Sequence, residues 1–178
     1  MSRRRKRMDG MSRHWQYGTA HRIYDLDVEA LWSRGYRALL LDLDNTLVPW
    51  HGEAVSPEVA DWLCDAADRG FVLCMVSNSK GSRARKLQKL LHIPEAVYQA
   101  GKPLRRGFRQ AQTRLGLPPE QCLVIGDQLL TDILGATRSG MPCILVDPMA
   151  RRELWATYAL RWIERAILHR RIQWEDET

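Results

Sequence analysis

Nearly continuous apolar runs recur along the chain, and segments with a different spacing of apolar residues separate them. The runs are YRALLLDLD, FVLCMVSNS, AVYQA, QCLVIGD and PCILVDP, all within residues 36–148. Runs of this kind are typical of parallel strands that are covered on both faces, because no side of such a strand has to face water. We therefore predict five strands.

The segments before and between these strands have apolar residues at helical spacing and residues that favour helix ends. In the clearest case Ser56 is a good N-cap, Pro57 suits the first helical position, and Gly70 is a typical stop. On the same grounds we predict helices over residues 25–35, 56–70, 82–93, 103–117 and 129–140.

Strands that alternate with helices through short links favour right-handed crossovers. The expected fold is therefore α/β: a doubly wound parallel sheet with helices on both faces. Each connection among the first three strands holds a single helix, so we expect no large cap domain. The predicted division is a basic N-terminal tail (residues 1–20), the α/β domain (21–150), and a C-terminal basic amphipathic helix with its tail (151–178).

The composition is that of a soluble protein with an excess of positive charge. The 178 residues are 45% hydrophobic and 27% charged, which is ordinary for a globular domain. No apolar stretch approaches the roughly 20 residues that span a bilayer, and no apolar signal-peptide segment follows the basic N-terminus. The four cysteines have no paired spacing, which favours reduced thiols. We expect a cytoplasmic location, with peripheral contact at the inner membrane surface left open.

A net charge of +6 favours an acidic partner, which leaves nucleic acid, an anionic membrane surface and a phosphorylated substrate as candidates. The polar residues at the ends of the predicted strands narrow this choice of partner. In doubly wound sheets, ligands bind at the carboxyl ends of the strands. The polar residues of the core segments gather at four such ends: DLDNT, SNS, GK and GDQLLTD.

Carboxylates follow two of these strands. Asp42 and Asp44 follow the first, and Asp127 and Asp132 follow a later one. Carboxylate oxygens suit Mg²⁺, which proteins usually hold by one or two carboxylates together with substrate phosphate. Several carboxylates at one place would raise each other's pKa unless a cation kept them ionised. We therefore predict a Mg²⁺ site made by these four residues.

Phosphate-binding groups are predicted at the other two strand ends. Ser77 and Asn78 stand just before a helix, where a hydroxyl and backbone N–H groups meet the positive end of the helix dipole. Lys102 precedes another helix and can supply a point charge. Together with Thr46, these residues are predicted to bind the phosphate of a substrate.

The four segments, in this order, resemble the signature of the haloacid dehalogenase superfamily of phosphotransferases: DxDxT, then Ser or Thr, then Lys, then GDxxxxD. The resemblance covers residues 23–147. It implies that Asp42 is the nucleophile that forms an aspartyl phosphate, and that Asp44 is the general acid and then the general base. Because the phosphatases of the family have Asp where the ion pumps usually have Thr, Asp44 also implies hydrolysis.

The same resemblance implies roles for the remaining residues. Ser77 would hold the oxygens of the transferring phosphoryl group, and Lys102 would steady that charge and the nucleophile. Mg²⁺ would lie between the Asp42 carboxylate, the Asp44 backbone carbonyl and Asp127. Asp132 would support these ligands without being one of the direct ligands itself.

Residues 23–50 and 124–140 resemble more closely the YqeG-type branch, which is related to the phosphatidylglycerophosphate phosphatases of mitochondria. This resemblance implies phosphatidylglycerophosphate, an anionic phospholipid, as the substrate. Aromatic residues at helical spacing among arginines in residues 151–174 fit a helix on anionic lipid, and equally a terminal helix packed on the sheet with a solvated basic face.

Other readings of the sequence remain. The same chemistry suits a small phosphorylated metabolite, a phosphoprotein or a nucleic-acid end, although RRRKR in the tail is more often a solvated arm than a nucleic-acid contact. A phosphorylated signalling receiver would need a carboxylate after a later strand, and none ends FVLCMVSNS. The oligomeric state is not predicted.

Overall fold

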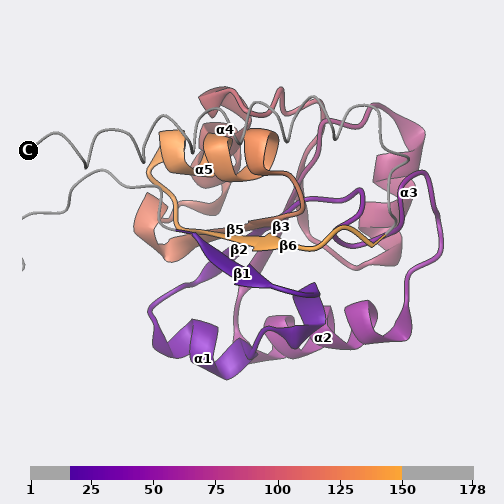
Figure 1. The fold of residues 1–178 in the computed structure, drawn as a ribbon, viewed down its shortest axis with the longest axis horizontal. Coiled ribbons are helices and arrows are strands. Elements are labelled where there is room, and N and C mark those ends of the chain that lie inside the picture. Colours follow the sequence, from indigo (N-terminus) through magenta and orange to yellow (C-terminus); the bar gives the residue numbers. More distant parts are fainter. Residues whose placement is uncertain (1–16, 150–178) are drawn as a thin grey trace, which may run out of the picture.

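The computed structural model describes residues 17–149, and within them six strands form one sheet (Figure 1). Its strand order is β1-β6-β5-β2-β3-β4, and every neighbouring pair is parallel. The strands are β1 Gly18–Ala20, β2 Ala38–Leu41, β3 Val72–Val76, β4 Glu95–Val97, β5 Cys122–Gly126 and β6 Cys143–Val146. The predicted parallel α/β fold is confirmed, and β2 lies in the middle of the sheet.

Helices cover both faces of the sheet. They are α1 Val28–Ser33, α2 Pro57–Arg69, α3 Ser82–Leu90, α4 Arg105–Leu115 and α5 Leu134–Ser139. In Figure 1, α1 and α2 lie on one side of the sheet, and α4 and α5 lie on the other. Side chains alternate along a strand, so Leu39 and Leu41 of β2 enter the core with α1, α2 and α3, whereas Ala38 and Leu40 enter the core with α4 and α5.

All five helices are shorter than predicted, and two of the differences have a clear local cause. The helix predicted from residue 103 begins at Arg105, because Leu104 is extended (ψ 143°) and its N–H closes a turn on the carbonyl of Gly101. The helix predicted over residues 129–140 opens with a π-helical turn, Leu129–Ile133, before α5. Short 3₁₀ turns also occur at Ile23–Asp25 and Pro119–Gln121.

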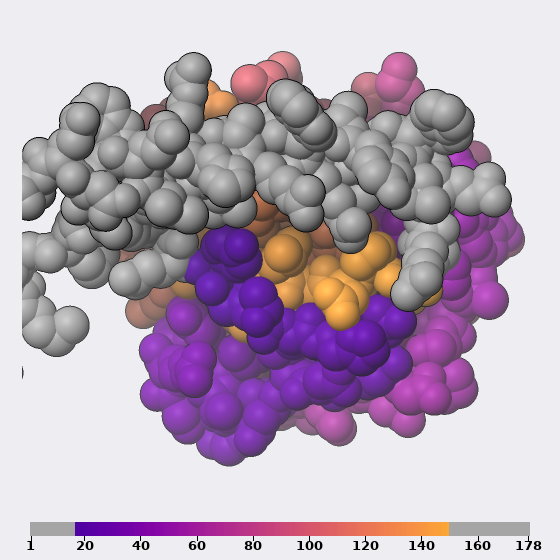
Figure 2. All heavy atoms as spheres, in the orientation of Figure 1, coloured from indigo at the N-terminus to yellow at the C-terminus, as the bar shows by residue number. Residues whose placement is uncertain are grey.

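The fold begins before the predicted boundary at residue 21. Gly18–Ala20 form β1, which pairs with β6 at the edge of the sheet, so the indigo and orange ends of the described part lie side by side (Figure 2). This strand is short and mostly exposed, so it lacks the apolar run by which the other strands were predicted. The rest of the predicted tail and the predicted C-terminal amphipathic helix lie outside the described residues.

The connections on either side of β3 are short and are described in full. The chain passes from β2 to β3 through α2, and from β3 to β4 through α3, with no inserted cap domain. None of the helices in residues 17–149 is long and apolar enough to cross a bilayer. Within residues 17–149, the carboxyl edge of the sheet is therefore covered by the loops that follow the strands and not by an inserted domain.

Candidate active site

Asp42 and Asp44 leave β2 on the same side of the chain, with the fully buried Leu43 pointing into the core between them. The chain then turns sharply, and the carbonyl of Leu43 accepts hydrogen bonds from the N–H groups of residues 47 and 48. Asn45 takes a left-handed conformation in this turn (φ 66°), which asparagine tolerates better than most residues. The turn holds both carboxylates at the carboxyl edge of the sheet.

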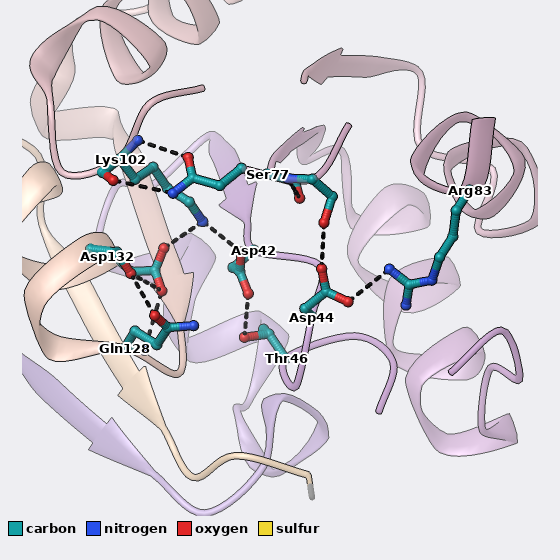
Figure 3. Close-up of polar contacts among 11 residues, drawn as sticks. Asp42, Asp44, Thr46, Ser77, Arg83, Lys102, Gln128 and Asp132 are labelled. Atoms are coloured by element: carbon teal, nitrogen blue, oxygen red, sulfur yellow. Dashed lines mark hydrogen bonds and ion pairs between the residues drawn. The ribbon is translucent and has the colours of Figure 1, made fainter. Parts of the chain in front are cut away.

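Lys102 joins two of the predicted carboxylates (Figure 3). Its Nζ donates to Asp42 Oδ1 at 2.5 Å and to Asp132 Oδ1 at 2.6 Å, and all three side chains are buried. Thr46 Oγ1 donates to the other oxygen of Asp42 at 3.3 Å. The nucleophile predicted from the sequence thus lies between an ammonium group and a hydroxyl.

Asn78 holds the Lys102 loop in place. Its Oδ1 accepts from the Lys102 N–H at 2.8 Å, and its Nδ2 donates to the Lys102 carbonyl at 3.1 Å. Asn78 lines the pocket, as does the buried Ser77, whose Oγ accepts from the Ser79 N–H at 3.0 Å. In this arrangement the Asn78 amide positions Lys102, and the Thr46 hydroxyl is bonded to Asp42, so Ser77 is better placed than either to meet a phosphate.

Three carboxylates form a group that suits a metal ion. Oxygens of Asp42, Asp127 and Asp132 all lie within 4.8 Å of one another, and Asp127 Oδ1 is a buried oxygen without a hydrogen-bond partner. Hard oxygen ligands in such a group fit Mg²⁺. The Asp44 carboxylate is outside this group, so of the four predicted metal residues it is the one whose side chain turns elsewhere.

A glycine is required next to this group. A Cβ on Gly126 would lie 2.4 Å from Asp132 Cγ, much closer than atoms can approach. Asp132 lies in the π-helical turn, and its Oδ2 accepts from the Gln128 N–H at 3.2 Å. The glycine at the end of β5 therefore gives the Asp132 carboxylate room to reach Lys102.

Burial changes the acidity of these groups. It raises the pKa of Asp42 to about 7, against the opposing charge of Lys102 and with the help of Asp132 and Asp127. Burial, and then the charge of Asp132, raise the pKa of Asp127 to about 7. Burial lowers the pKa of Lys102, but the Asp132 and Asp42 carboxylates outweigh it, and the net shift is upward. Without a further cation the group thus favours partial protonation.

This predicts an unusual dependence of stability on pH in the metal-free protein. A carboxyl whose folded pKa lies above its unfolded value of about 3.8 binds its proton more tightly in the folded state. It therefore stabilises the fold most when it is protonated and least when it is ionised in both states. Its contribution to the stability is therefore nearly complete at pH 4, falls as the pH rises between the two pKa values, and is gone above about pH 7. In EDTA, Asp127→Asn should match the wild type near pH 4 and exceed it by a few kcal/mol at pH 8.

Urea unfolding at both pH values measures this difference. Asp68→Asn, the same change on the exposed side of α2, serves as the control and should not show it. An Asp127→Asn protein that is less stable than the wild type at pH 8 would contradict the raised pKa.

The pocket between these residues has a volume of about 210 Å³. Besides the predicted residues, its lining contains four that were not predicted from the sequence: Trp50, Ser79, Gln128 and Thr131. Arg83, also not predicted, reaches the Asp44 carboxylate from α3. Ser79 stood in the SNS segment and Arg83 in a basic helix, but neither pattern indicates a bond to Asp44.

The comparisons with known proteins agree with this geometry. Residues 99–153 match a family model described as HAD-hydrolase-like. The chain is 37% identical over 159 residues to the protein of Bacillus subtilis named Probable phosphatase YqeG, and the match covers 86% of this chain and 92% of that protein.

Two further matches are more distant. The chloroplastic Phosphatidylglycerophosphate phosphatase 1 of Chlamydomonas reinhardtii is 30% identical over 136 residues, which cover 71% of this chain and 50% of that protein, so the chain spans about half its length. The magnesium-bound crystal structure of the HAD-hydrolase YfnB from Bacillus subtilis has a TM-score of 0.52 and 14% identity, and the match covers 67% of this chain and 90% of that one. This second likeness shows the fold. With the YqeG match over most of its length, the chain belongs to the haloacid dehalogenase-like phosphatases of the YqeG type.

Proposed function

We propose that the protein is a Mg²⁺-dependent phosphomonoester hydrolase that forms an aspartyl phosphate on Asp42, and that its substrate is phosphatidylglycerophosphate. The observation that carries the chemistry is that Asp42, Asp44 and Lys102 line one pocket. Phosphoryl transfer needs mainly positioning and neutralisation of charge, and this set of residues provides both.

In the first step, an Asp42 oxygen attacks the phosphorus in line with the leaving oxygen. The bond from phosphorus to the leaving oxygen breaks, and the Asp44 carboxyl donates its proton to that oxygen. Lys102 contacts Asp42 and balances the negative charge at the attacking carboxylate. Ser77 donates a hydrogen bond to the phosphoryl oxygens.

In the second step, a water molecule attacks the phosphorus of the aspartyl phosphate. The Asp44 carboxylate accepts a proton from this water, the bond from phosphorus to the Asp42 oxygen breaks, and orthophosphate leaves. Mg²⁺ would be held by Asp42, Asp127 and the Asp44 backbone carbonyl, with Asp132 supporting them, and when bound it neutralises the phosphate charge. The unpartnered Asp127 oxygen supports this assignment.

The size of the pocket supports a large substrate that is mostly held outside it. A volume of about 210 Å³ is below the roughly 300–1,000 Å³ of pockets that enclose small ligands. The phosphoryl group fits inside, and the part of the chain that the structure describes contains no cap domain to cover the remainder. Binding energy must then come from parts of the substrate beyond the reacting group, which a lipid at a surface supplies. The similarity to a phosphatidylglycerophosphate phosphatase supports this lipid in particular.

Phosphate release from a panel of substrates tests the proposal. The panel contains phosphatidylglycerophosphate in vesicles, glycerol 3-phosphate, a nucleotide, a sugar phosphate and a phosphopeptide, each with Mg²⁺ or with EDTA. We expect kcat/KM for the lipid to exceed that of every soluble ester by about 100-fold, which is about 2.7 kcal/mol of transition-state stabilisation. Activity should disappear in EDTA and return with Mg²⁺.

Two results would count against parts of the proposal. A hundredfold preference for the sugar phosphate would exclude the lipid and leave the phosphatase. Full turnover in EDTA would exclude the metal and require another source of positive charge at the phosphate.

A further inference from the structure

The Asp44 carboxylate is bound at both oxygens by groups from the β3–α3 segment. Arg83 Nη1 donates to Oδ1 at 2.8 Å, and Ser79 Oγ donates to Oδ2 at 2.6 Å. Figure 3 shows Asp44 between Asp42 on one side and Arg83 on the other. The residue proposed to move the proton is thus held by an ion pair on the side away from the nucleophile.

This arrangement does not suit a general acid. A carboxylate that accepts from an arginine and from a hydroxyl has both oxygens engaged as acceptors, and a guanidinium has only donors. To give a proton to a leaving oxygen, Asp44 must first be released from one of its two partners. The Ser79 hydroxyl can rotate and either donate or accept, so it can remain bonded in both protonation states. Arg83 is the partner that has to move.

Arg83 is well suited to such a movement. Its side chain is 21% exposed, so part of it already meets solvent. Its Nη2 donates to the Gly52 carbonyl at 2.6 Å, but its Nε is buried without an acceptor. A buried donor without a partner is unfavourable. An anion that engages the guanidinium in place of Asp44 can satisfy this donor once the side chain turns.

The substrate brings such an anion to this place. If the phosphomonoester lies against Asp42 and Lys102, its leaving oxygen lies beside Asp44, and the rest of the substrate continues on that side. We propose that Arg83 recognises a second anionic group of the substrate, of the phosphodiester class, and that it releases Asp44 when it does so. This inference rests on the proposed function, whose lipid carries a phosphodiester three carbons from the leaving oxygen.

A phosphodiester matches the chemistry of Arg83 better than other groups of such a substrate do. The guanidinium is planar and permanently charged, and two of its N–H groups can bind two phosphate oxygens side by side. A neutral hydroxyl offers no charge to compete with the Asp44 carboxylate. Arg83 would therefore distinguish a doubly phosphorylated lipid headgroup from a simple phosphate ester of the same alcohol.

Two measurements on Arg83→Gln test the inference. The first is inhibition of p-nitrophenyl phosphate hydrolysis by dihexanoyl phosphatidylglycerol, a soluble lipid that has the diester and lacks the monoester. The second is the ratio of kcat/KM for dihexanoyl phosphatidylglycerophosphate to that for glycerol 3-phosphate. We expect the inhibition constant to rise, and the ratio to fall, each by about 30-fold, as for the loss of a charged hydrogen bond.

The chain offers a matched control. Lys86 lies on the same helix and pairs with Glu53 of the loop that follows Gly52, and both side chains are exposed. Lys86→Gln removes the same charge and should leave the inhibition constant and the ratio within about twofold of the wild type. Arg83→Lys keeps the charge but lacks the two parallel N–H groups of the guanidinium, and it should raise the inhibition constant several-fold. This variant replaces Arg83→Gln in the test if Arg83→Gln does not fold.

The outcomes separate the inference from the proposed function. If kcat/KM falls by the same factor for dihexanoyl phosphatidylglycerophosphate and for glycerol 3-phosphate, and the inhibition constant does not change, Arg83 only positions Asp44. The inference is then wrong. It is equally wrong if Arg83→Gln changes neither quantity while the lipid is still hydrolysed. If the wild type does not hydrolyse the lipid but diester inhibition depends on Arg83, the proposed substrate fails and anion recognition by Arg83 stands.

Discussion

Asp42→Asn is expected to reduce turnover of every phosphomonoester by about 10⁴-fold or more. The amide is a poor nucleophile, and it has no negative charge for Lys102 Nζ, which lies 2.5 Å from Asp42 Oδ1 in the wild type. Release of p-nitrophenol measures the loss of activity. Mass spectrometry of acid-quenched enzyme should find a phosphorylated Asp42 peptide in the wild type and none in the variant.

The control for this variant is Asp68→Asn, the same chemical change at an exposed position of α2, which should keep full activity. A cooperative melting transition shows that each variant is folded. Turnover at the wild-type rate by a folded Asp42→Asn protein would contradict the proposed mechanism.

Lys102→Met should affect stability as well as activity. The ammonium group is buried and is bonded to Asp42 and Asp132, and its loss leaves buried carboxylates without a positive partner. Removal of one member of a buried ion pair costs about 3–5 kcal/mol. We expect this loss in urea unfolding at pH 8, together with a fall in kcat of about 10³-fold, since charge stabilisation at the phosphate is lost as well.

The dependence on pH distinguishes this explanation from a simple packing defect. At pH 5 the Asp42 carboxyl, whose pKa is raised to about 7, is mostly protonated, so the loss of the lysine should cost less than at pH 8. Lys86→Met, which breaks an exposed pair, should change neither stability nor kcat appreciably. A Lys102→Met cost that is equal at the two pH values would mean that charge is not its cause.

The residues at the carboxyl edge of the sheet could be predicted because a parallel sheet brings the ends of its strands together. Once β2, β3 and β5 are known to be parallel neighbours, Asp42, Ser77 and Asp127 have to follow strands that end at the same edge. Both the strands and this convergence can be deduced from apolar runs and short links.

Contacts between side chains of different loops could not be predicted in this way. Helical spacing puts Ala84 and Leu87 of α3 in the core and leaves Arg83 on the flank of the helix, but it does not say that Asp44 lies opposite. Likewise, the sequence does not indicate that both ends of the Asn78 amide are bonded to the backbone of Lys102, and phosphate binding by Asn78 stays a prediction. The edge strand β1 has too few apolar residues for any pattern to indicate it.

The central place of β2 has a consequence for how activity returns on refolding. Its partners are far away in the chain: Leu41 pairs with Met75 of β3 on one side and with Ile125 of β5 on the other. Contacts of such high contact order form slowly, because the intervening loops must close before any pairing is gained. Asp42, Lys102 and Asp127 meet only after both closures. Helical signal should therefore recover ahead of enzymatic activity, which reports the last long-range pairing of the sheet.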